Sequence, residues 1–125
     1  MITNKPTEAE LEILQVLWEH GPSTVRFVND ILNQEREVGY TTTLKLMQIM
    51  ADKHLVRRNT EHRTHVYAAA IQEADMQQHL LKKFVDTTFR GSAMKMVMQA
   101  LGNHDASQEE LDEIKALIKK MESDQ

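Results

Sequence analysis

The chain has 125 residues, of which 41% are hydrophobic and 27% are charged, and it contains no cysteine. This length fits one domain, or a domain of about 70 residues with an accessory segment that needs a partner to complete its core. Without cysteine, disulfides, thiolate metal sites and a cysteine nucleophile are excluded, and no apolar stretch approaches the roughly 20 residues of a membrane-spanning helix.

The net charge of −4 argues mildly against nucleic acid as a partner, because Lys and Arg supply most of a protein's affinity for phosphates. The charge is unevenly distributed, however. Residues 53–67 contain four Lys or Arg and one acidic residue, whereas residues 71–125 contain seven basic and ten acidic residues. The N-terminal stretch MITNKPTEAE has neither the basic start nor the apolar middle of a signal peptide, so we expect a cytoplasmic protein.

Two amphipathic helices are predicted at the start of the chain. Thr7 and Glu10 form a capping box that begins the first helix, which runs to His20 and is ended by a Gly-Pro pair. The second helix begins at Ser23 or Thr24 and ends in a polar stretch. The apolar stripe of the first helix is Leu11, Leu14, Val16, Leu17 and Trp18, and that of the second is Val25, Phe27, Val28, Ile31 and Leu32.

A third helix is predicted after Gly39, with Tyr40 or Thr41 as its cap and with Leu44, Met47, Met50 and Thr43 on its inward face. Residues 55–59 and 64–68 are predicted to form two short strands of a hairpin that must lie on the helices, because an isolated hairpin is unstable. These elements complete an N-terminal domain of residues 1–70. The outward face of the third helix carries Thr41, Thr42, Lys45, Gln48, Ile49 and Asp52.

A helix followed at once by a short basic hairpin is typical of the DNA-reading half of a winged helix, in which the helix enters the major groove. Threonine side chains can contact thymine methyl groups and base edges, Lys45 guanine or phosphate, and Gln48 adenine. The alternative is that both segments are merely solvated. The candidate DNA-binding residues are Thr41, Thr42, Lys45, Gln48 and Ile49 in the helix, and Arg57, Arg58 and Arg63 in the hairpin, where Arg57 and Arg58 must lie on opposite faces.

Three more amphipathic helices are predicted in residues 71–125, the last of them opened by a second capping box at Ser107 and Glu110. Three helices in about 50 residues are too few to close a core, so we expect this segment to pair with its own copy. Its outer faces carry no membrane-binding patch. The expected dimer contacts are Leu80, Phe84, Met98, Leu101, Leu111, Ile114, Leu117 and Ile118.

No catalytic, cofactor or metal site is predicted. His54, His62 and His65 lack the cysteine or paired carboxylate that would complete a metal site, and the three methionines between 94 and 98 are more typical of a core than of copper(I) ligation. The chain has no Gly-rich phosphate loop, nucleophile motif or carboxylate pair set among apolar residues. We therefore expect a protein that is not an enzyme.

Three motifs occur in series: LEILQVLW at 11–18, Tyr40-Thr41-Thr42 at the start of the third helix, and LVRR at 55–58 followed by Tyr67. With three helices after them, they make the chain resemble the bacterial penicillinase and copper-responsive repressors of the BlaI/MecI/CopY group over almost its whole length. The resemblance implies a homodimeric repressor with an N-terminal winged helix-turn-helix and a C-terminal dimerisation domain, bound to a palindromic operator in double-stranded DNA.

The resemblance also implies how such a repressor is released. Penicillinase-type repressors are cleaved within the dimerisation domain after a membrane sensor metalloprotease detects a β-lactam, and the comparable stretch here is 97–101. The Asn-Phe pair of staphylococcal relatives is Gln99-Ala100 in this chain. Copper repressors of the group use a pair of Cys-x-Cys motifs, a mechanism that a chain without cysteine cannot operate.

Taken together, these features predict a mostly α fold with a small β-hairpin, divided into residues 1–70 and 71–125, and a sequence-specific repressor that acts as a homodimer. The alternative is a module that uses the winged-helix scaffold to bind another protein, without sequence-specific DNA binding.

Overall fold

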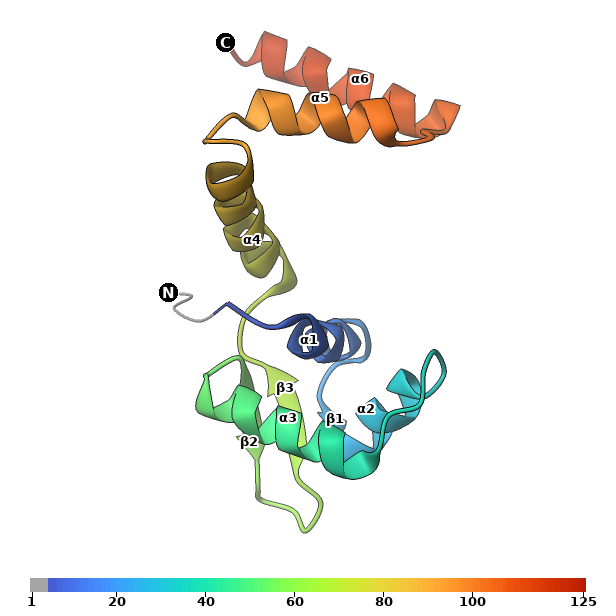
Figure 1. Cartoon of the computed structure of the whole chain (residues 1–125), viewed down its shortest axis with the longest axis vertical. Helices are drawn as coiled ribbons and strands as arrows, with labels where there is room; N and C mark the ends of the chain where they lie inside the picture. The colour runs from blue at the N-terminus through green and yellow to red at the C-terminus, as the bar shows by residue number, and fades with distance from the viewer. Residues whose placement is uncertain (1–4) are drawn as a thin grey trace. The chain divides into compact units, whose positions relative to one another are not determined.

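The computed structural model describes residues 5–125, which form six helices and a three-stranded sheet (Figure 1). They divide into an N-terminal unit that ends at Leu81 and a C-terminal unit, Lys82–Gln125. No helix in the described range is long and apolar enough to cross a membrane. The elements are α1 (Glu8–His20), β1 (Ser23–Thr24), α2 (Val25–Leu32), α3 (Tyr40–Asp52), β2 (Val56–Asn59), β3 (Val66–Ala69), α4 (Glu73–Thr88), α5 (Ala93–Asn103) and α6 (Gln108–Ser123).

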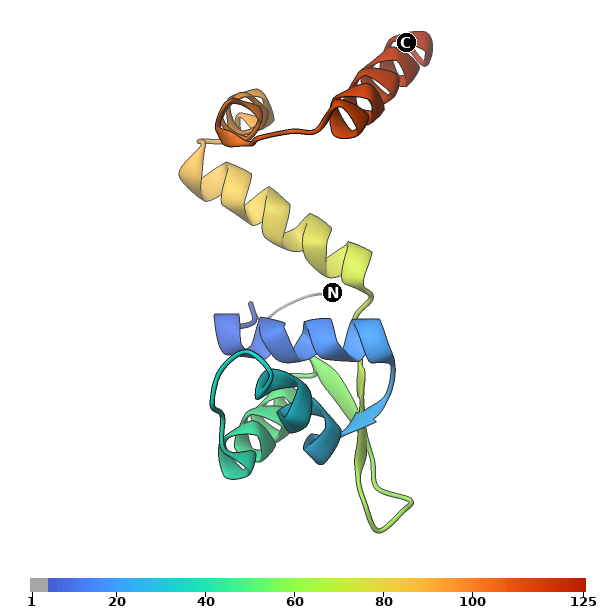
Figure 2. The same cartoon turned by 90° about the vertical axis from the view of Figure 1, so that its right-hand side faces the viewer.

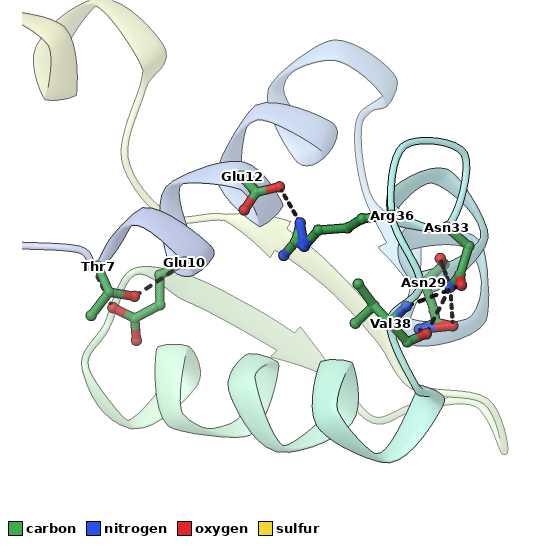
Figure 3. A network of polar contacts seen from close by, with 7 residues as sticks. All are labelled: Thr7, Glu10, Glu12, Asn29, Asn33, Arg36 and Val38. Carbon is green, nitrogen blue, oxygen red and sulfur yellow. Dashed lines mark hydrogen bonds and ion pairs between the residues drawn. The ribbon is translucent and has the colours of Figure 1, made fainter.

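The first helix has the predicted ends. The Thr7 hydroxyl accepts a hydrogen bond from the Glu10 N–H at 3.2 Å, and the Glu10 carboxylate accepts one from the Thr7 N–H at 2.9 Å, so the capping box is confirmed (Figure 3). At the other end Gly21 takes a positive φ of 80° and its N–H closes on the Leu17 carbonyl. Ile13, which the predicted stripe omitted, is fully buried.

The predicted start of the second helix, Ser23 or Thr24, was wrong by one or two residues. Ser23 and Thr24 form the strand β1, which pairs with Tyr67 and Val66, and the helix α2 begins only at Val25. Thr24 is its cap, because its hydroxyl accepts from the N–H of residue 27 at 3.1 Å. A strand of two residues has no alternation to detect, and its partner lies more than 40 residues later.

Phe27 was predicted to lie in the buried apolar stripe of α2, and this was wrong. Its side chain is 39% exposed and stands edge to face against His20, with ring centroids 5.2 Å apart. The inward position that completes the stripe is instead occupied by Asn29, which is 6% exposed. Helical spacing explains this, because positions 25, 28, 29 and 32 share one face and position 27 does not.

The third helix begins earlier than predicted. Its cap was expected at Tyr40 or Thr41 and lies at Gly39. Gly39 is the cap and supplies no side-chain hydrogen bond, so Tyr40 lies inside α3. Three residues of the predicted inward face, Thr43, Met47 and Met50, are fully buried, and the fourth, Leu44, is half-buried against the core. At the C-terminal end His54 takes a left-handed φ of 64°, and hydrogen bonds from its N–H and from the next N–H return to the last turn, which directs the chain into β2.

The sheet is antiparallel with the order β1-β3-β2, so β3 is the central strand. The predicted hairpin is confirmed, with strands shifted by one or two residues and a loop at 60–65 that extends beyond the helices of this unit (Figure 2). Arg58 lies opposite Tyr67 in the ladder, and Arg57 lies opposite Ala68. Because side chains alternate along a strand, the two arginines lie on opposite faces of the sheet.

The core of the N-terminal unit collects apolar side chains from all three helices and from the sheet, including Leu14, Met47 and Tyr67. Met76 at the start of α4 is fully buried in the same core, and Leu80 packs against it. The indole N–H of Trp18 donates to the Ile71 carbonyl at 2.9 Å and so ties α1 to the segment that leads into α4. The structural boundary therefore falls inside α4, whereas the domains proposed from the sequence meet at residue 70.

The C-terminal unit comprises the rest of α4 with α5 and α6, and neither of the last two helices buries a residue. The second capping box is confirmed, because the Ser107 N–H and hydroxyl each form a 3.1 Å hydrogen bond with Glu110. Large apolar side chains are open to solvent along these helices, with Met98 63%, Leu117 58% and Ile118 51% exposed. Much of the apolar surface of this unit is therefore exposed to solvent.

An ion pair joins α1 to the end of α3. Glu10 is 1% exposed, and its two carboxylate oxygens lie 2.9 and 3.0 Å from the Lys53 ammonium. Burial by itself raises the pKa of Glu10, but the hydrogen bond from the Thr7 N–H and the bond and charge of Lys53 outweigh it, so the pKa is lowered from its usual 4.5. The carboxylate is therefore charged in the folded protein at neutral pH.

We expect Glu10→Gln to lower the free energy of unfolding by about 1–3 kcal/mol at pH 7, because glutamine preserves the capping box but leaves Lys53 without its charge partner. Urea unfolding followed through Trp18, the single tryptophan, measures this loss. A lowered pKa stabilises the fold above pH 4.5 and loses that contribution as pH falls through the folded value, so the gap between the proteins should shrink below pH 4.5.

Glu12→Gln is the matched control. Glu12 forms a 2.7 Å pair with Arg36 in which both side chains are more than 40% exposed, so its loss should cost less than about 1 kcal/mol. Equal effects of the two substitutions would contradict the role given to the buried pair.

Candidate nucleic-acid interface

One face of α3 is polar and open to solvent. Thr41, Thr42, Lys45, Gln48 and Ile49 are all exposed, while the opposite face of the helix is packed in the core. The residues singled out from the sequence therefore share one accessible surface. Lys45 is the single cation among them, so this face offers hydrogen-bonding groups and methyl groups rather than strong positive charge.

Asn29 holds the start of α3 against α2 (Figure 3). Its buried side-chain amide donates to the Val38 carbonyl at 3.1 Å and to the Thr43 hydroxyl at 2.9 Å. Asn33 reinforces the turn, because its amide group donates to the same Val38 carbonyl at 2.8 Å and accepts from the Val38 N–H at 3.1 Å. These bonds fix both the entry of the chain into α3 and one buried side chain of the helix.

Sequence reasoning missed this network and read residues 33–37 only as a polar end to the second helix. A signal was present in the chain, since Asn29 occupies a core-facing position of an otherwise apolar stripe. A buried amide requires hydrogen-bond partners. Those partners, however, are Val38 and Thr43, which lie 9 and 14 residues later in the chain, and spacing alone does not identify them.

The arginines of the hairpin separate into two groups. Arg58 and Arg63 line a hollow of about 300 Å³ beside α3, which we call the arginine hollow and define by Arg26, Tyr40, Gln48, Arg58, Arg63 and His65. Arg57 instead lines a second hollow, with Trp18 and Ile71, on the other face of the sheet. Two of the three predicted wing residues therefore lie beside α3, and the third does not.

Arg26 lies at the arginine hollow as well, and the sequence analysis did not single it out. It comes from the first turn of α2, and its guanidinium carbon lies 4.8 Å from the centroid of the Tyr40 ring. The signal in the sequence was an arginine in the helix that precedes the predicted DNA-reading helix. Its proximity to Arg58 and Arg63 arises only when α2 and the hairpin pack on either side of α3.

The remaining residues of interest are distributed as follows. Gln99 and Ala100 are exposed within α5, and His54, His62 and His65 are exposed at a helix end and in the hairpin loop. Within residues 5–125 no group of three or more His, Asp or Glu side chains is arranged to hold a metal ion. Of the residues expected at a dimer interface, Leu80 packs on the N-terminal core and Ile114 is half-buried, whereas the others are exposed: Phe84, Met98, Leu101, Leu111, Leu117 and Ile118.

Comparison with known proteins identifies relatives along nearly the whole chain. A family model described as penicillinase repressor matches residues 6–120. The chain is 20% identical over 118 residues to the methicillin resistance regulatory protein MecI of Mammaliicoccus sciuri, covering 94% of this chain and 96% of that protein. It is 25% identical over 112 residues to the penicillinase repressor of Bacillus licheniformis, covering 90% and 88% respectively.

Solved structures of a BlaI repressor resemble more than half of the chain. The DNA-binding domain of the repressor BlaI matches 57% of this chain and 87% of that structure, with a TM-score of 0.51 at 25% identity. The monomeric form of Bacillus licheniformis BlaI in complex with the blaP half-operator matches 60% and 90%, with the same TM-score and identity. RosR of H. salinarum matches 98% of both chains with a TM-score of 0.51, and at 16% identity this shows a shared fold alone.

We expect Thr43→Val to lower the free energy of unfolding by about 1–2 kcal/mol, because the isosteric side chain removes an acceptor of the buried Asn29 amide. Thr42→Val changes the same atoms at the next, exposed position and should alter stability by less than about 0.5 kcal/mol. Urea unfolding followed by Trp18 fluorescence compares the two. If Thr42→Val were as harmful as Thr43→Val, helix propensity rather than the Asn29 bond would be responsible.

Proposed function

Because the chain belongs to the penicillinase repressor family, we propose that it is a transcriptional repressor that binds a palindromic operator as a homodimer. One observation carries the proposal. The exposed polar face of α3 lies beside a hollow lined by three arginines, on a unit that has its own packed core. This pairing of base-reading groups with phosphate-binding groups is what a major-groove helix requires.

In this proposal the side chains of α3 read base edges. Thr41, Thr42 and Ile49 present methyl groups suited to thymine, Lys45 reaches guanine or phosphate, and Gln48 can form two hydrogen bonds with adenine. Arg58 and Arg63 bind backbone phosphate. We assign Arg57 no phosphate on this side of the domain, because it lies on the opposite face of the sheet.

We infer that the C-terminal unit pairs with a second copy. Its helices expose apolar side chains that a partner would remove from water, at about 25 cal/mol for each Å² of apolar surface buried. Two-fold symmetry then places two α3 helices in major grooves separated by one helical turn or a small multiple of it, which makes the operator an inverted repeat. Linking two winged-helix units that each bind DNA weakly raises the effective affinity by about 100-fold.

Release of the operator follows from the same arrangement. Any event that separates the two C-terminal units returns each winged helix to its weak individual affinity. A cut in α5 between Gln99 and Ala100 would have this effect, since both residues are exposed and α6 would be severed from the rest of the chain. A membrane sensor metalloprotease is the kind of partner that would make this cut.

The rival function is a module that binds another protein through the winged-helix scaffold. The two functions differ in what they require of α3. Sequence-specific reading requires that a base-contacting side chain such as Gln48 affect one DNA sequence more than another, which protein binding does not.

We expect the protein to bind a duplex from its own promoter more tightly than a scrambled duplex of equal composition in an electrophoretic shift at 0.15 M salt. Gln48→Ala should weaken promoter binding by about 5- to 100-fold and leave the scrambled duplex unchanged. Arg58→Ala with Arg63→Ala should weaken both duplexes by roughly 30-fold for each protomer bound, because two phosphate contacts are lost.

The control for charge is Arg36→Ala with Arg57→Ala, which removes the same two positive charges away from the arginine hollow. Its affinity should change less than about threefold. A wild-type protein that binds its promoter duplex no more tightly than the scrambled duplex would refute the repressor proposal and favour the protein-binding module.

The dimer has a separate test. Light scattering at micromolar concentration should give about twice the 14.4 kDa chain mass. Leu117→Asp places a charge on the exposed apolar face of α6 and should yield monomers, whereas Ala116→Asp introduces the same charge on the other side of the helix and should leave the dimer intact. A monomeric wild-type protein would contradict the homodimer.

A further inference from the structure

The arginine hollow is assembled from three separate elements. Arg26 belongs to α2, Tyr40 begins α3, and Arg58 and Arg63 come from β2 and the hairpin loop. No Asp or Glu is among its lining residues. In a chain with a net charge of −4, this places an unusual share of the positive charge of the N-terminal unit at one concave surface.

The three arginines of the hollow lack a carboxylate partner within the described part of the chain, where no Asp or Glu oxygen lies within 4.0 Å of any of them. Arg36 and Lys53, by contrast, each have one at 2.7 and 2.9 Å. Neighbouring like charges repel one another, and an anion bound between them relieves this repulsion.

Tyr40 contacts the guanidinium of Arg26 through the face of its ring, not through a hydrogen bond. The guanidinium carbon lies 4.8 Å from the ring centroid, so the cation is held against the ring face by attraction to the π electrons. A guanidinium has five N–H donors, and a contact with the ring face leaves donors available for the oxygens of an anion. The ring therefore acts as a support that reduces the entropy Arg26 would lose on binding.

We propose that Arg26, positioned by Tyr40, binds with Arg58 and Arg63 a phosphate diester of the DNA backbone, an inference that rests on the proposed function. Phosphate contacts set the register of a protein on the duplex, and base contacts then specify the sequence. Tyr40 is the first residue of α3 and also contacts Arg26. The proposed phosphate contact is therefore connected directly to the helix proposed to read bases. The site exists only when α2, α3 and the hairpin are packed together.

Arg26→Gln tests the contact by fluorescence anisotropy, with the promoter duplex and the scrambled duplex titrated over a range of salt concentrations. Loss of one phosphate contact should reduce the slope of log K against log[salt] by about 0.9 for each protomer bound and weaken both duplexes about fivefold at 0.15 M salt. Arg26→Lys should retain the slope. Arg36→Gln removes the same charge from a residue paired with Glu12 and should change neither quantity.

The positioning role of Tyr40 requires a double-mutant cycle. Arg26→Gln should cost less affinity in a Tyr40→Leu background than in the wild type, with a coupling of about two- to fivefold, whereas a Tyr40→Phe background should preserve the full effect because the ring remains. Additive effects in the Tyr40→Leu background would overturn the positioning role. We expect the circular dichroism spectra of these variants to match that of the wild type, because both positions are exposed.

The outcomes separate this inference from the proposed function. A wild-type protein without promoter preference refutes the repressor proposal itself. A wild-type protein that prefers its promoter, together with an Arg26→Gln slope equal to that of Arg36→Gln, refutes only the phosphate site. Inorganic phosphate at constant ionic strength should not displace the duplex, and displacement at millimolar phosphate would show that the hollow serves a free anion instead.

Discussion

The side-chain amide of Asn29 donates to the Val38 carbonyl and to the hydroxyl of Thr43, and these bonds hold the start of α3, the helix of the candidate site, against α2. The amide is buried, so its bonds are formed where water does not compete. They fix the end of the turn that precedes α3 and one buried side chain in the first turns of the helix. The apolar residues Met47 and Met50 occupy the inward face of α3, and most of its polar residues are left on the outward face.

Charge in this protein is handled in two ways. Lys53 and Arg36 are neutralised by carboxylates of α1, and these pairs join elements of the fold to one another. Arg26, Arg58 and Arg63 lack such partners in the described structure and line one hollow beside α3. An acidic chain can therefore present a local cationic surface, since the field near a surface depends on neighbouring groups more than on net charge.

The two units differ in how much of their apolar surface they bury. The N-terminal unit closes its own core, with Met76 of α4 sealing it, whereas α5 and α6 bury no residue. A surface of exposed leucine, isoleucine and methionine on helices with well-formed caps is typical of an interface between chains. Capping stabilises the helices individually but leaves their apolar side exposed, which supports the proposed pairing with a second copy.

The sequence by itself determined what depends on neighbouring residues: the capping boxes at Thr7 and Ser107, the inward face of α3 and the opposite faces of Arg57 and Arg58, because helix and strand periodicities span only a few positions. It also indicated the fold class and the face that carries the candidate site. Tertiary structure alone decided the pairing of β1 with β3, the partners of Asn29 and the addition of Arg26 to the arginine hollow. Each of these joins separate elements in space, and sequence spacing carries no record of such contacts.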